Sequence, residues 1–84
     1  MELKQFRAKW IARLASMSME GREKELAGML IVKLYNLRAA NLADLAFTLY
    51  RILEDEAVKP EFKETMYSML RDLNELIEKQ FRGE

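Results

Sequence analysis

The chain has 84 residues and a formal net charge of zero, so it is long enough for one small domain and has no overall basic excess pointing to nucleic acid or anionic lipid. It contains neither Cys nor His, which excludes a disulfide scaffold, a catalytic thiol, a Ser-His-Asp triad and a zinc site built on those ligands. Leu, Glu, Ala, Lys, Arg and Met supply 53 residues, whereas Ile, Val and Thr supply eight, and this composition predicts an all-α protein.

A first helix is predicted over about 2–16. Apolar side chains fall three or four residues apart along it and form one stripe: Leu3, Phe6, Trp10, Leu14 and Met17. The segment SMSMEG then interrupts the pattern. Ser18 is the candidate N-cap of the next helix, with Glu20 and Glu23 in its first turn, where the helix dipole favours carboxylates.

The second predicted helix, over about 19–37, is apolar on two sides. Four leucines form one stripe: Leu26, Leu30, Leu34 and Leu37. A second stripe lies on the opposite side: Gly28, Ile31, Val32 and Tyr35. Such a helix is either central in a bundle or covered in part by another chain.

The connection after this helix contains neither Gly nor Pro, so the second and third helices could be continuous, giving three helices in all. Asn41, followed three positions later by Asp44, resembles a helix-starting capping box and favours a separate third helix over about 41–56. Its predicted core face is leucine-rich. Phe47 and Tyr50 lie well away from that face.

Pro60 starts the last predicted helix, over about 60–82, at a first-turn position where proline is tolerated. Apolar residues then keep a helical period from Phe62 to Phe81. Four helices with short connections pack most simply as a small antiparallel bundle, and we expect a single helical-bundle domain over 1–84.

The surplus apolar surface suggests a function. Five side chains on the second and third helices are predicted to form a protein interface: Ile31, Val32, Tyr35, Phe47 and Tyr50. Since burial of one large apolar side chain contributes roughly 1.5–3 kcal/mol, a few of them can decide association. We therefore expect a non-catalytic protein–protein interaction module, such as a small regulator, inhibitor or adaptor, that forms a homodimer and binds another protein.

The alternative is a nucleic-acid-binding protein that uses the basic first helix. Residues 1–42 carry a net charge of +4 and residues 43–84 a net charge of −4. Four basic side chains of the first helix are the candidate phosphate contacts: Lys4, Arg7, Lys9 and Arg13. The favoured interpretation of these residues is that they pair with the acidic half, within the chain or across a dimer.

Other chemistry finds little support. No Gly-rich phosphate loop and no activated serine is recognisable, so we expect no catalytic residues, no cofactor and no metal. The acidic residues Glu54, Asp55 and Glu56 are consecutive and point in different directions, which favours a solvated turn over a Ca²⁺ or Mg²⁺ site. No 18-residue apolar run and no signal-peptide core occurs, so we expect a soluble, cytoplasmic protein with no membrane partner.

Overall fold

The structure, a computed structural model, describes residues 1–83. It contains four α-helices and one short 3₁₀ turn: α1 (Leu3–Ser16), α2 (Gly21–Tyr35), η1 (Ala39–Asn41), α3 (Leu42–Leu53) and α4 (Pro60–Phe81). The described residues contain no strand. The all-α fold with four separate helices is therefore confirmed, and the alternative of a continuous middle helix is wrong.

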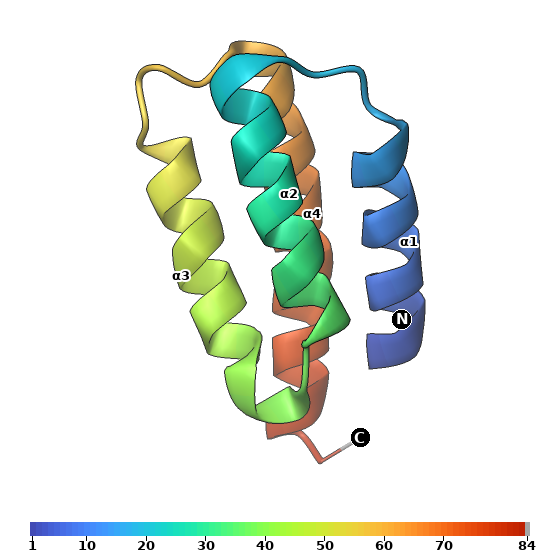
Figure 1. Cartoon of the computed structure of the whole chain (residues 1–84). Coiled ribbons are helices and arrows are strands. Elements are labelled where there is room, and N and C mark those ends of the chain that lie inside the picture. The colour runs from blue at the N-terminus through green and yellow to red at the C-terminus, as the bar shows by residue number, and fades with distance from the viewer. Residues whose placement is uncertain (84) are drawn as a thin grey trace.

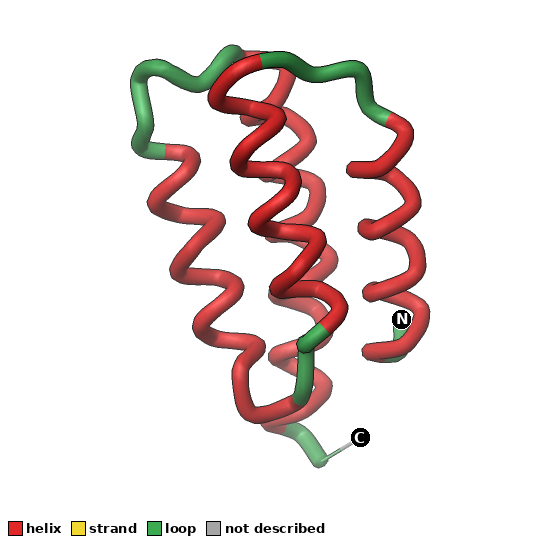
Figure 2. Tube along the Cα trace, viewed as in Figure 1, coloured by secondary structure: helices red, strands yellow, loops and turns green. Residues whose placement is uncertain are grey.

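The helices run alternately up and down, as in an antiparallel bundle (Figure 1). α2 lies in front of α4 in this view, and α1 and α3 lie on opposite sides of them. The connections α1–α2 and α3–α4 cross one end of the bundle, and the α2–α3 turn closes the other end (Figure 2). Since α1 packs mainly on α2, and α3 on α4, the bundle consists of two helical hairpins placed side by side.

Every helix contributes to one hydrophobic core. The largest fully buried side chains include Phe6, Trp10, Leu30, Leu49 and Met69. They stand on the stripes that the helical period predicts, so the periodicity of the sequence accounts for the core. Trp10, at the centre of the stripe of the first helix, is a core residue.

The α1–α2 connection differs from the prediction. α2 begins after Glu20, whose backbone is extended, so Ser18 is not its N-cap. Gly21 opens the helix with a φ of 60°, a left-handed conformation that costs glycine little and other residues more. The helix therefore starts two residues later than the apolar pattern suggests.

Two asparagines close the α2–α3 turn without glycine or proline. The amide of Asn36 donates to the Val32 carbonyl at 2.9 Å, and that of Asn41 donates to the Asn36 carbonyl at 3.2 Å. The side-chain oxygen of Asn41 accepts the Arg38 N–H at 2.8 Å. Asn41 precedes α3 as predicted, but its side chain stabilises the preceding turn rather than the first turn of α3.

Candidate functional site

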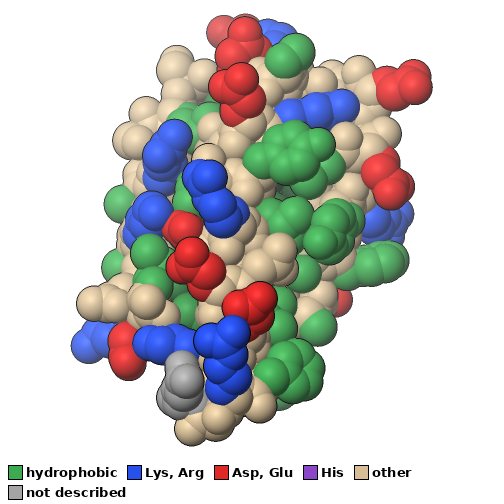
Figure 3. All heavy atoms as spheres, turned by 180° about the vertical axis from the view of Figure 1, so that it is seen from behind, with side chains coloured by type: hydrophobic (Ala, Val, Ile, Leu, Met, Phe, Trp, Pro, Cys, Tyr) green, Lys and Arg blue, Asp and Glu red, His purple; other side chains and the backbone are tan. Residues whose placement is uncertain are grey.

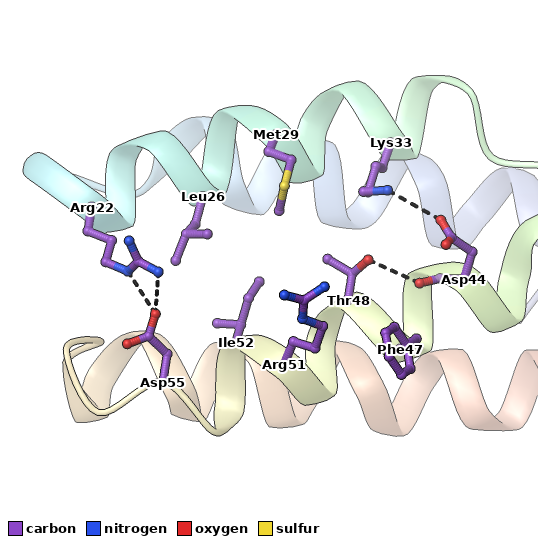
Figure 4. A pocket seen from close by; sticks show the side chains of 10 residues that line it. All are labelled: Arg22, Leu26, Met29, Lys33, Asp44, Phe47, Thr48, Arg51, Ile52 and Asp55. Atoms are coloured by element: carbon purple, nitrogen blue, oxygen red, sulfur yellow. Dashed lines mark hydrogen bonds and ion pairs between the residues drawn. The ribbon is translucent and has the colours of Figure 1, made fainter.

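A groove of about 540 Å³ separates α2 from α3, along the seam between the two hairpins (Figure 4). Leu26 and Met29 project into it from α2, and Ile52 projects from α3. Thr48 and Phe47 line the same groove from α3. The groove thus has apolar side chains on both walls.

Ion pairs bridge the groove at both ends (Figure 4). At one end Arg22 Nε donates to Asp55 Oδ2 at 2.8 Å, and at the other Lys33 Nζ donates to Asp44 Oδ2 at 3.3 Å. Asp55 also accepts the Ala57 N–H at 2.9 Å. This backbone hydrogen bond, followed by the one from Arg22, lowers the pKa of Asp55 below its ordinary value.

Arg51 lies between these two ion pairs (Figure 4). It is exposed, and none of the described acidic side chains forms an ion pair with it. The groove therefore presents a cation whose charge the described part of the chain leaves uncompensated, two turns along α3 from the exposed carboxylate of Asp44.

The outer side of α3 is aromatic. Phe47 is 62% exposed and Tyr50 is 50% exposed, and Tyr67 on the neighbouring helix α4 is 60% exposed. Hydrophobic side chains gather over the half of the rear face that α3 and α4 form (Figure 3). Tyr67 was not among the predicted interface residues. Its position outside the apolar stripe of the last helix is the signal that identifies it.

The other predicted interface residues lie on α2. Ile31 packs partly against the core, so the fold already covers part of its surface. Val32 and Tyr35 are 60% and 66% exposed. Val32 lines a smaller hollow that shares the side chains of Lys33 and Asp44 with the α2–α3 groove, so it borders the same seam.

Two of the four basic side chains predicted as phosphate contacts are engaged within the fold. Lys9 donates to Asp72 at 2.6 Å, and Arg7, which is half-buried, donates to the Leu37 carbonyl in the α2–α3 connection. Lys4 and Arg13 are exposed. The structure therefore shows that Lys9 pairs with the acidic half of the chain.

Asp72 also accepts the buried Trp10 Nε1–H at 3.0 Å. Partial burial raises the pKa of Asp72, but the hydrogen bonds from Lys9 and Trp10 outweigh it, so the pKa lies below its ordinary value. Lys9 and Arg13 stand over the Trp10 ring, 5.0 and 5.6 Å from its centroid. This cluster joins α1 to α4 and has a clear structural role.

Within residues 1–83, no group of three or more Asp or Glu side chains converges in a way that would hold a metal ion. In the same range, no helix is both long enough and apolar enough to cross a membrane. Comparison with protein-family models, curated proteins and solved structures finds no significant match to this chain.

Proposed function

We propose that the protein is a non-catalytic interaction module that self-associates through the outer side of α3, with Phe47 at the centre of the contact. One observation carries the proposal. α3 has twelve residues and only two charges, Asp44 and Arg51, yet its solvent side displays Phe47 and Tyr50. Aromatic side chains enriched on a surface poor in charge are typical of protein contacts.

The expected affinity is modest. A helix of twelve residues is about 18 Å long, so a contact centred on α3 is short. Each half-exposed aromatic contributes roughly 1–2 kcal/mol on burial, and two copies supply two such pairs. Association itself costs at least about 4 kcal/mol, so at most about 4 kcal/mol remains and we expect a weak dimer with a Kd on the order of 1 mM.

Size-exclusion chromatography with light scattering, over a range of protein concentrations, tests the proposal. The mass should rise from 9.9 kDa toward about twice that value as the concentration passes the expected Kd. Phe47→Glu should remain monomeric with an unchanged far-UV circular dichroism spectrum, because it places a charge at the centre of the contact. Val32→Glu, on the same seam, should weaken association less.

Phe81→Glu is the matched control. It makes the same change at a phenylalanine that is 87% exposed at the end of α4, away from the α2–α3 seam. It should dimerise like the wild type. A wild type that stays near 9.9 kDa at the highest concentration, or a Phe47→Glu variant that dimerises normally, would refute the proposal.

A further inference from the structure

We infer that the second copy docks antiparallel on α3, with Asp44 of each copy opposite Arg51 of the other. This inference rests on the proposed function, because it specifies the partner and register of the same face. It adds a prediction that self-association alone does not make: the contact has one orientation, set by two equivalent ion pairs.

The spacing of the two charges carries the argument. Asp44 and Arg51 are seven residues apart, which is about two turns or roughly 10.5 Å along the helix, so both project from the groove side of α3 (Figure 4). A two-fold axis near Phe47 and Thr48, at the midpoint, brings each carboxylate to the other copy's guanidinium. A parallel arrangement in register would instead place like charges together.

The same axis arranges the uncharged residues favourably. Phe47 lies beside the axis, so it meets Phe47 of the second copy. Tyr50 and Ala43 are both exposed and lie on opposite sides of the axis, about 4 Å and about 7 Å from it along the helix. The two-fold axis therefore brings Tyr50 of one copy to within about 3 Å, along the helix direction, of Ala43 of the other. A tyrosine ring spans that offset, and a large side chain beside a small one lets two helices approach closely. Both aromatic residues are then covered in a single register.

Both charged groups are available for this contact. The Asp44 side chain is 66% exposed, and its 3.3 Å contact with Lys33 leaves acceptor positions free for a second donor. Arg51 is exposed and has no ion-pair partner among the described residues. At an interface, such complementarity determines orientation more than total affinity.

Charge reversal followed by mixing tests the register. Asp44→Arg alone sets the introduced arginine against Arg51 of the other copy, and Arg51→Asp alone sets the introduced aspartate against Asp44. Each variant should therefore dimerise at least about tenfold more weakly than the wild type. In an equimolar mixture, a copy with two arginines meets a copy with two aspartates. Both ion pairs then form, and light scattering should show recovery of the dimer mass.

Glu64→Arg and Arg71→Asp on α4 are the matched controls, because these exposed residues have the same spacing and the same charge changes. They should dimerise like the wild type, alone or mixed. If Asp44→Arg loses helical circular dichroism, the neutral pair Asp44→Asn and Arg51→Gln replaces the reversals, and each neutral variant should weaken the dimer about threefold or more.

The outcomes separate the two proposals. A wild-type dimer that Phe47→Glu disrupts, but whose reversed variants do not recover on mixing, overturns the antiparallel register and leaves the proposed function intact. Reversed variants that dimerise like the wild type overturn the register as well. A wild type that is monomeric throughout overturns both.

Discussion

Replacing Asp72 with alanine should destabilise the fold by about 2 kcal/mol, and the structure explains where this value comes from. Trp10 is completely buried, and its Nε1–H donates to Asp72 Oδ2 at 3.0 Å. Removing that acceptor leaves a buried donor unsatisfied, at a cost of about 1–3 kcal/mol. Loss of the pair with Lys9, which is 45% exposed, adds about 0–1 kcal/mol. Alanine recovers roughly 0.5 kcal/mol through its higher helix propensity.

Two further variants divide this total. Asp72→Asn keeps an oxygen that can accept from the indole, so it should cost less than about 1 kcal/mol. Lys9→Met keeps the indole hydrogen bond and removes only the partly exposed cation, so its cost should also stay below about 1 kcal/mol. The expected order places Asp72→Ala well above both.

Urea titration near neutral pH measures these differences, at protein concentrations below those at which dimers form. Trp10 is the only tryptophan, so its fluorescence reports on its own environment, and far-UV circular dichroism follows the helices. Asp72→Ala within about 0.5 kcal/mol of the wild type would refute the reasoning. An equal cost for Lys9→Met would assign the stabilisation to the ion pair instead of the indole bond.

The stability difference between the wild type and Asp72→Asn should depend on pH in a defined direction. The folded-state pKa of Asp72 lies below its ordinary value, so the folded state binds this proton less readily than the unfolded state. The stabilisation is complete above about pH 5 and is lost as the pH falls through the folded pKa, below about 3.9. The stability difference between wild type and Asp72→Asn should therefore shrink in acid. A difference that stays constant would contradict the assignment.

Three substitutions test the backbone. Gly28 lies inside α2 with open space where a Cβ would stand, so Gly28→Ala should raise the free energy of unfolding by about 0.5–1 kcal/mol. Gly21 has equal space but a φ of +60°, so Gly21→Ala should lower the free energy of unfolding by about 1 kcal/mol. Thermal melts in which Gly28→Ala and Gly21→Ala shift the melting temperature in the same direction would contradict this account. Asn41→Ala should lower the urea midpoint by removing about 1 kcal/mol of turn hydrogen bonding, whereas an unchanged midpoint would show that the turn does not need it.

The helices could be predicted because their apolar residues repeat with the helical period. Trp10 and Leu49 stand at the centres of such stripes and are fully buried, and Pro60 opens α4 at its first residue as predicted. The ends of α2 were less predictable. The start depends on the positive φ of Gly21, and the break before α3 depends on hydrogen bonds of Asn36 and Asn41, neither of which periodicity reveals.

The candidate site was predictable only in part. The positions of Phe47 and Tyr50 off the core stripe predict their exposure, which the structure confirms. Ile31 shows the limit of this reasoning, because part of the second stripe of α2 packs against the core. The α2–α3 groove depends on how far apart two helices of different hairpins lie, and a pattern within one helix contains no information about that distance.

The segregation of charge along the chain has a structural explanation. In the described part of the chain, three ion pairs link the basic first half to the acidic second half: Lys9–Asp72, Arg22–Asp55 and Lys33–Asp44. The first and third join two helices, and the second joins α2 to the α3–α4 connection. Each such pair is worth only about 0–1 kcal/mol, so their effect is to orient the hairpins rather than to supply most of the stability. Two of them bridge the groove, where apolar contact between α2 and α3 is incomplete.

Among the charged residues that line the groove, Arg51 is the exception, since it has no ion-pair partner in the described chain. The intramolecular pairing that accounts for Lys9, Arg22 and Lys33 leaves this guanidinium uncompensated, on the same side of α3 as the exposed carboxylate of Asp44. In the proposed dimer, a second copy related by a two-fold axis compensates it without any further residue. In the dimer that we propose, this unpaired charge of the groove therefore gives the contact its direction.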